Sequence, residues 1–336
     1  MEKMESSGGN HLLLEDRTDS QTRNSNESLG INLRDPSVGS NSNTAAIHIG
    51  DLIREKEREK EFYHSFELVS PRGEEEASER ETKNKCAPLF FAFTWHGTFA
   101  ENCRHLQHFS RFPKNTLLHL TAKGLRRQDV EYILKKILNL GITNLLVLRG
   151  DDPPDNGDFP YAVDLIKFIR SLYNDKFCIG VAGYPDTHPE SPSRESDLYY
   201  LKKKVNAGAS FVITQILFES RGFIRFVEDC RSCGIDVPII PGIIVISNYK
   251  AFMKLEKNCN LTVPKKIHED LSKIDEKNDE IRDYGINLAT RIVQEILSTG
   301  IVHGYHLFTL NKLSEAQHIS SNLIRKLRHP STSSQN

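Results

Sequence analysis

The sequence lacks the features of several large classes of protein. No apolar run approaches the roughly 20 residues that cross a bilayer, and the apolar stretch at residues 11–14 is too short for the core of a signal peptide. A formal net charge of −1 gives no electrostatic reason to bind nucleic acid or an anionic membrane. We therefore expect a cytoplasmic protein whose partners are neither nucleic acid nor membrane.

The sequence also lacks a cysteine framework. Its 6 cysteines are scattered, as is typical of a reducing compartment. Cys230 and Cys233 form one CxxC inside a helical pattern, but no second pair or histidine follows at the spacing of a zinc site. We predict no metal site.

Composition predicts one folded region between two polar ends. The chain has 336 residues, of which 38% are hydrophobic, and this is enough to build a core. Residues 1–48 are dominated by Ser, Asn, Asp, Thr and Gly, which cannot bury enough surface to offset the entropy of ordering. We predict a disordered tail over 1–48, a folded domain over 49–328 and a second disordered tail over 329–336.

Within the folded region, apolar runs of strand length alternate with helical patterns. The predicted strands are 62–69, 89–95, 116–121, 144–148, 178–184, 211–218, 238–246 and 302–310. The predicted helices are 50–61, 127–140, 161–173, 196–207, 222–233, 278–298 and 314–327. Eight strands in regular alternation with helices favour an α/β fold of the (β/α)8 TIM-barrel type, and an open doubly wound sheet is the alternative. Neither GxGxxG nor GxxxxGK[ST] is present, so the barrel is favoured.

Polar and aromatic residues follow the predicted strands where each one ends. The clearest case is the buried run Leu145–Leu148, which stops at Arg149-Gly150-Asp151. Because the loops after barrel strands converge on one mouth, such residues are candidates for chemistry. The other strand-end candidates are Glu67, Thr94, Trp95, His119, Tyr184, His188, Gln215 and the residues around "GYHLFTLNK".

Several long strings resemble one enzyme family. "LRGDDPP", "YAVDLIKFIR", "VAGYPDTHPE", "DLYYLKKKVNAGASFVITQILFE", "IPGI" and "FTLNK" are similar to the catalytic domain of methylenetetrahydrofolate reductases. The resemblance runs from about Phe62 to Leu310. It implies a homo-oligomeric enzyme with an FAD-holding barrel. In this reaction a hydride passes from NADPH or NADH through the flavin to 5,10-methylenetetrahydrofolate, giving 5-methyltetrahydrofolate.

The resemblance also assigns the cofactor residues. It implies FAD contacts at Thr94, Trp95, His119, Arg149, Gly150, Asp151, Tyr161, Ala162, Tyr184, His188, Asp197 and Lys204. The negative charge of Asp151 would tune hydride transfer, which makes this residue catalytic as well. Asp197 can accept from ribose hydroxyls, and Lys204 and His188 can meet the pyrophosphate. Asp197 and Lys204 lie two turns apart, so we expect both on one side of a helix.

Glu67 matches the general acid of the family. Opening the folate ring requires a proton at the departing N10, and a carboxyl group delivers it only if a dry pocket raises its pKa. We expect Phe66, Leu68 and Val69 to form the walls of that pocket. The resemblance further implies that Gln215 orients the pterin, and that nicotinamide and folate use one flavin face in turn.

Some positions depart from the family pattern. Phe308 stands where the family has a substrate-binding Tyr, and Lys312 stands where it has Arg, which weakens the grip on folate. Residues 73–85 offer almost no apolar face for packing. The resemblance does not include the C-terminal regulatory domain of eukaryotic members. A second hypothesis therefore stays open: a diverged or truncated paralogue that binds FAD but acts as a weak enzyme or as a binding partner of a full-length reductase.

Overall fold

The computed structural model describes six stretches of the chain. They are residues 47–69, 87–94, 115–150, 157–274, 279–310 and 313–328. All of them belong to one compact unit, Ala45–Asn336. The two terminal tails predicted from composition fall almost wholly outside the described residues, so their boundaries stay a prediction.

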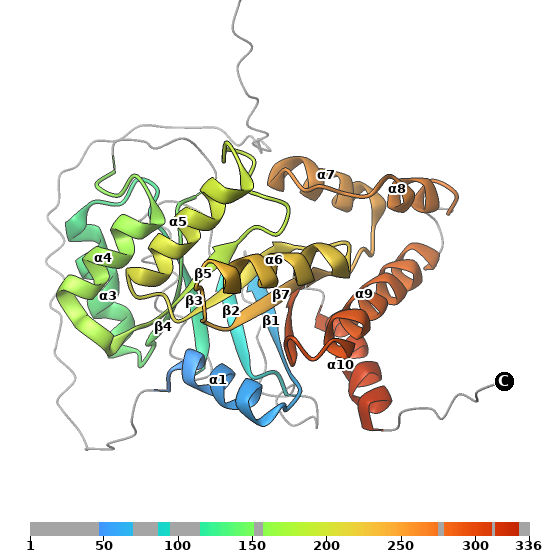
Figure 1. The fold of residues 1–336 in the computed structure, drawn as a ribbon, viewed down its shortest axis with the longest axis horizontal. Coiled ribbons are helices and arrows are strands. Elements are labelled where there is room, and N and C mark those ends of the chain that lie inside the picture. Colours follow the sequence, from blue (N-terminus) through green and yellow to red (C-terminus); the bar gives the residue numbers. More distant parts are fainter. Residues whose placement is uncertain are drawn as a thin grey trace, which may run out of the picture. The chain divides into compact units, whose positions relative to one another are not determined.

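Eight parallel strands close into a barrel in the order of the sequence (Figure 1). The ring closes where β8 pairs with β1, placing Ser65 opposite His306. The strands are β1 (Tyr63–Val69), β2 (Phe90–Thr94), β3 (Thr116–Thr121), β4 (Asn144–Leu148), β5 (Cys178–Gly183), β6 (Phe211–Ile216), β7 (Ile239–Ile244) and β8 (Gly304–Phe308). The predicted (β/α)8 barrel is confirmed, and the open doubly wound sheet is excluded.

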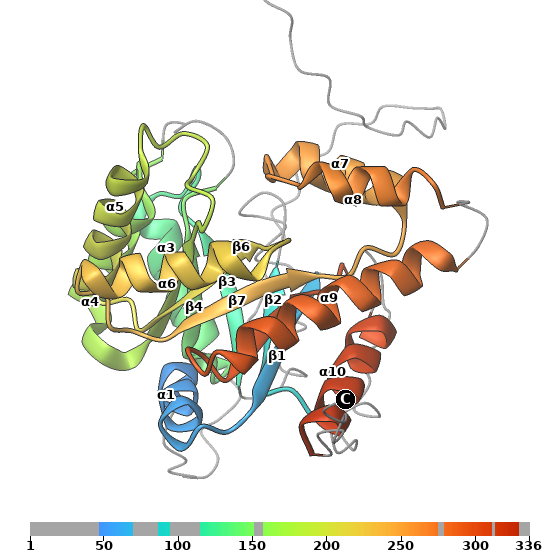
Figure 2. The ribbon, with the colours of Figure 1, turned by 45° about the vertical axis from the view of Figure 1, so that its right-hand side comes forward.

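Helices cover the outside of the barrel (Figure 2). The described helices are α1 (Ile49–Glu59), α3 (Arg127–Asn139), α4 (Ala162–Tyr173), η3 (Asn174–Lys176), α5 (Arg194–Asn206), α6 (Ser220–Ser232), α7 (Tyr249–Cys259), α8 (Lys265–Leu271), α9 (Glu280–Ser298) and α10 (Leu313–Arg328). Helix α4 packs on β4, α9 on β7 and α10 on β1. None of the helices in the described residues is both long and apolar enough to cross a membrane.

The sequence did not predict α7 and α8. In α7 only Phe252 is buried, and Tyr249 and Leu255 are partly buried against the core, so few side chains mark its inner face in the sequence. Its start is instead fixed by Asn248, whose side chain accepts a hydrogen bond from the amide of Ala251 at 2.9 Å. Both helices lie at the end of the barrel opposite α1 in Figures 1 and 2.

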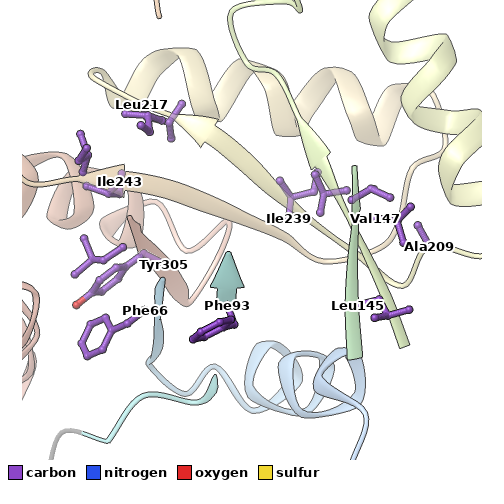
Figure 3. Close-up of a cluster of buried hydrophobic side chains, with 14 of the residues drawn as sticks. Phe66, Phe93, Leu145, Val147, Ala209, Leu217, Ile239, Ile243 and Tyr305 are labelled. Carbon is purple, nitrogen blue, oxygen red and sulfur yellow. The ribbon is translucent and has the colours of Figure 1, made fainter. Parts of the chain in front are cut away.

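Alternation along the strands sorts their side chains into two clusters. One cluster draws on seven strands together with α1, and in a closed barrel only the interior brings these elements together. It consists of Ile49, Ile53, Tyr63, Phe90, Ala92, Leu117, Leu146, Cys178, Phe211, Ile213 and Ile240. The larger cluster lies between strands and helices, and Figure 3 labels Phe66, Phe93, Leu145, Ile239 and Tyr305 among its members.

Glycines make room for aromatic rings inside the barrel. A Cβ added to Gly304 would lie 2.4 Å from the ring of Tyr63. A Cβ added to Gly242 would lie 2.6 Å from the ring of Phe308 and 2.3 Å from the carbonyl oxygen of Thr214. These interior positions therefore exclude any side chain larger than hydrogen.

Helix α1 closes the end of the barrel at which the strands begin. The side chain of Asn144, at the start of β4, accepts from the amide of Ile49 at 2.8 Å and donates to the carbonyl of Ile47 at 3.0 Å. The amide of Gly50 donates to Sγ of Cys178, at the start of β5, at 3.2 Å. With this end sealed, the mouth formed by the strand C-termini is the entrance left to the interior.

Candidate active site

Several strand-end candidates occupy inward positions at the mouth. Along β1, Glu67 keeps the alternation of the interior residue Tyr63, and along β2, Thr94 keeps that of Phe90. His119 and Gln215 stand two positions beyond interior residues of β3 and β6. The period of two thus brings residues from distant parts of the sequence to one layer of the barrel.

Glu67 is a buried acid in this layer. The residue is only 7% exposed, and Thr94 Oγ1 donates to its Oε1 at 2.7 Å. Thr309 Oγ1 donates to its main-chain oxygen at 2.6 Å and fixes the strand beside it. Burial raises the pKa of the Glu67 carboxyl group, and the hydrogen bond from Thr94 partly offsets this rise. A carboxyl group with a raised pKa can hold a proton for transfer.

Two histidines lie close to this acid. Nδ1 of His119 lies 2.9 Å from Thr94 Oγ1, so Thr94 bridges the imidazole and the carboxyl group. His306, deeper in the barrel, is joined through Nδ1 to the hydroxyl of Ser65 at 2.8 Å. Burial, with a smaller contribution from His119, lowers the pKa of His306 to about 3. His306 is therefore neutral at physiological pH.

The expected walls of the Glu67 pocket are wrong in two of three cases. Phe66 and Leu68 belong to the outer cluster between strands and helices, because neighbours of Glu67 in a strand point to the opposite face. The side chain of Val69 lies outside the described residues. The desolvation of Glu67 comes instead from the barrel interior, where Ala92 and Thr94 of the adjacent strand lie beside it.

A second group of charged residues gathers beyond β4 and β5. Arg149 pairs in two-point fashion with Glu190, at 2.5 Å for Nη1 to Oε2 and 2.7 Å for Nη2 to Oε1. The backbone amide of Glu190 donates to Nδ1 of His188 at 3.1 Å, and the His188 ring meets Tyr184 edge-on at 4.6 Å. Burial lowers the pKa of His188, and the charges of Arg149 and Lys204 lower it further, whereas Glu190 and Asp197 partly offset the shift.

Asp197 and Lys204 share one side of α5, as their spacing predicts. Ser193 caps this helix by accepting from the amide of Ser196 at 3.2 Å, so α5 begins at Arg194, two residues before the predicted start. Lys204 Nζ donates to the carbonyl of Ala182 at 2.7 Å. Burial of the ammonium group lowers the pKa of Lys204 to about 8 although Asp197 opposes the shift, and burial raises the pKa of Asp197.

Gly150 and Tyr161 shape the rim between these groups. Gly150 has a φ of 107°, and a Cβ there would lie 2.8 Å from Cγ2 of Thr121 and 2.9 Å from Cβ of Lys123. Both its conformation and its surroundings therefore require glycine. Tyr161 is 57% exposed and precedes α4, while Ala162 begins that helix and is buried.

Comparison with known proteins identifies the family. The family model described as methylenetetrahydrofolate reductase matches residues 52–324. The chain belongs to the methylenetetrahydrofolate reductase family. This finding confirms the resemblance carried by the sequence strings.

Relatives from plants, animals and bacteria agree with this assignment. Methylenetetrahydrofolate reductase (NADH) 1 of Arabidopsis thaliana is 36% identical over 301 residues, covering 82% of this chain and 51% of the plant protein. The probable NADPH enzyme of Caenorhabditis elegans is 35% identical over 79% of this chain and 42% of its own length. The 5,10-methylenetetrahydrofolate reductase of Salmonella typhimurium is 34% identical over 257 residues, covering 74% of this chain and 86% of the bacterial protein. The chain thus spans about half the length of its plant relative and most of the bacterial one.

A solved structure shares the fold at low sequence identity. It is an uncharacterized protein from Clostridium thermocellum that binds two copies of 5-methyl-5,6,7,8-tetrahydrofolic acid. The likeness has a TM-score of 0.58 over 81% of this chain and 98% of that one, at 13% identity. At this identity the likeness concerns the barrel fold alone.

Two residues that the family resemblance assigns to folate lie at the mouth. The amide oxygen of Gln215 accepts from the backbone amide of Ile216 at 2.9 Å, which holds the side chain against its own strand. Phe308 packs over Gly242 and meets the ring of His306 edge-on at 4.9 Å. The mouth is therefore lined at this point by an aromatic ring without a hydroxyl group.

Three predicted site residues lie outside the described residues: Trp95, Asp151 and Lys312. Conversely, sequence reasoning missed Glu190. The only available signal was its place in "YPDTHPE", two residues after His188, and nothing in that string points to Arg149, which lies 41 residues away. The contact follows from the adjacency of β4 and β5 in the barrel.

Proposed function

We propose that this barrel reduces 5,10-methylenetetrahydrofolate to 5-methyltetrahydrofolate, with NADPH or NADH as hydride donor and FAD as cofactor. The observation that carries the proposal is Glu67, a buried carboxyl group with a raised pKa at the mouth of a barrel of this family. Folate reduction needs an acid of this kind, because N10 must be protonated as it leaves. The curated relatives support the reaction, and their names include both NADH and NADPH.

The residues beyond β4 and β5 fit the diphosphate of FAD. Arg149, His188 and Lys204 interact electrostatically there, and the pKa values of His188 and Lys204 are lowered. Burial is the main cause of both shifts, and a bound anion would stabilise the charged forms of these two groups further than Glu190 and Asp197 do. Asp197, on the same side of α5 as Lys204, is placed to accept from ribose hydroxyls.

Bound FAD would supply the chemistry of hydride transfer between nicotinamide and folate. The proton donor, the dry surroundings and the residues beside the pterin come from the chain itself. Glu67 holds the proton for N10 and the interior of the barrel keeps it dry, while Gln215 and Phe308 border the space left for the pterin. Folate and nicotinamide would enter the same mouth in turn, since α1 seals the other end.

The experiment that tests the proposal is an anaerobic spectral cycle on the purified chain reconstituted with FAD. We expect the flavin absorption to bleach on addition of NADPH or NADH, and to return on addition of 5,10-methylenetetrahydrofolate. A flavin that binds and bleaches but is never reoxidised by folate would favour the diverged paralogue. A chain that retains no FAD would overturn the cofactor assignment itself.

A further inference from the structure

The hydrogen bonds around Glu67 have a definite direction when its carboxyl group is ionised, since a carboxylate can only accept. Thr94 Oγ1 has one hydrogen, which it donates to Oε1 of Glu67 at 2.7 Å. Because this single hydrogen is donated to Glu67, Thr94 Oγ1 can act toward His119 Nδ1, 2.9 Å away, only as an acceptor. The chain of donation therefore runs from the imidazole through the hydroxyl group to the carboxyl group, and it sets the His119 tautomer with hydrogen on Nδ1.

This direction distinguishes the two oxygens of the acid. When the carboxyl group is neutral and Thr94 keeps this direction, Oε1 is an acceptor toward Thr94 and the proton lies on Oε2. Once that proton leaves, the Thr94 hydroxyl donates to a full negative charge, and such charge-assisted bonds are about twice as strong as neutral ones. The bond therefore favours the state that follows proton delivery.

We infer that Thr94 and His119 are positioning residues for the acid: together they direct the transferable proton to Oε2 of Glu67 and stabilise the carboxylate left behind. The inference rests on the proposed function and deepens it. It adds a role that the family resemblance, which assigns both residues to the flavin, does not give them.

The surroundings of Glu67 leave few groups other than Thr94 that can change the pKa of its carboxyl group. Its neighbours across β1 and β2 are uncharged, and Thr309 from the end of β8 donates to its main-chain oxygen. His119, from β3, and His306, from β8, are titratable side chains on the inner face of the barrel, but the pKa of Glu67 is shifted by burial, which raises it, and by the hydrogen bond from Thr94, which lowers it. His306 is already neutral across the working range, with a pKa of about 3. The titration of Glu67 therefore reports mainly on burial and on Thr94.

The test follows the protonation of Glu67 directly. In the FAD-loaded chain, the infrared carbonyl stretch of the protonated acid is identified by its loss in Glu67→Gln and is followed against pH. Thr94→Val keeps the side-chain shape but removes the donor, so we expect the pKa of Glu67 to rise by about one to two units, the equivalent of one hydrogen bond to a charged group. Thr94→Ser keeps the hydroxyl group and should titrate like wild type.

A second pair of variants tests His119. It also keeps the inference testable if the Thr94 variants do not fold. His119→Asn keeps an N–H donor near the position of Nδ1, whereas His119→Leu removes it. We expect the Leu variant to raise the pKa of Glu67 by less than Thr94→Val does, and the Asn variant to restore it in part.

The outcomes separate this inference from the proposed function. An unchanged titration in Thr94→Val and His119→Leu would overturn the inference even if folate turnover is intact. A downward shift would also overturn it, because it would mean that Glu67 donates to Thr94. The expected upward shift in a chain that cannot reduce folate would overturn the proposed function alone, since the infrared measurement needs no turnover.

Discussion

Arg149 and Glu190 join two loops at the barrel mouth by a two-point ion pair. The guanidinium group stands at the end of β4, and the carboxylate lies in the loop between β5 and α5. The same loop carries His188, whose ring accepts from the amide of Glu190. The ion pair therefore holds the loop in the shape that brings its histidine beside Arg149.

Loss of this ion pair should loosen the loop over residues 184–193. Partly exposed pairs contribute about 0.2–1 kcal/mol, so Glu190→Gln should speed hydrogen exchange of the loop amides by at most about five-fold. Arg149→Gln should have the same effect, and the double variant should add little to either single change. Additive effects in this cycle would show that the two side chains act independently.

Lys204 should contribute strongly to flavin retention. Lys204→Met removes a cationic contact to the diphosphate worth about 1.5–3 kcal/mol, which corresponds to roughly ten-fold or more weaker FAD binding. The matched control is Lys203→Met, since the ammonium of Lys203 is exposed over the ring of Tyr199 at 4.4 Å. Fluorescence titration of the apoprotein with FAD measures both. Equal affinities in the two variants would place the diphosphate elsewhere.

The same lysine should make the stability of the FAD-free chain depend on pH. Its pKa is about 8 in the folded chain against an ordinary value of 10.5, so the unfolded chain holds the extra proton between these values. The burial cost is fully present below about pH 8 and is relieved as the pH rises toward 10.5.

Lys204→Met should accordingly unfold at a higher temperature than wild type near pH 7, with a difference that shrinks above about pH 8. Thermal unfolding of the FAD-free chain across this range measures the effect, again with Lys203→Met as the control. A constant difference at every pH would mean that the ammonium group of Lys204 is not desolvated.

Two glycine variants should have opposite effects on stability. Gly242→Ala places a methyl group 2.3 Å from a backbone oxygen inside the barrel and should destabilise the fold by roughly 1–3 kcal/mol. Gly222→Ala lies in α6, where the nearest atom is 3.7 Å away, and should stabilise the chain by about 0.5–1 kcal/mol. Thermal unfolding of the two variants and the wild type measures both stability changes. If Gly242→Ala left the stability unchanged, the barrel interior would have more room at this position than the structure shows.

Much of the fold could be predicted from the sequence, because barrel strands leave a strong local signal. The bounds of β3 and β4 are the predicted 116–121 and 144–148, since each is an apolar run between turn residues. Helices with a broad apolar face, such as α9, were found for the same reason. Helices α7 and α8 were missed because they are short and bury only one or two side chains each, Phe252 in α7 and Ile267 and Leu271 in α8, which leaves a weak periodic signal.

The strand ends in the sequence name residues that the fold brings together at the mouth, but the sequence does not predict their contacts. Strand ends singled out Glu67, Thr94 and His119, yet the bridge that Thr94 forms depends on which residues of three strands share the inner face. The error over Phe66 and Leu68 has the same origin, since neighbours in sequence point to opposite sides of a strand. Pattern alone identifies strands, whereas contacts require the register between them.

The most direct test of the central claim measures both half-reactions in Glu67→Gln. Reduction of FAD by the nicotinamide needs no carboxylic acid, so its rate should stay within a few-fold of wild type. Reoxidation by 5,10-methylenetetrahydrofolate should slow by about 10² or more, because the proton for N10 is lost. Stopped-flow absorbance of the flavin follows each step separately. Equal losses in both half-reactions would contradict the account and make Glu67 a residue that only shapes the barrel mouth.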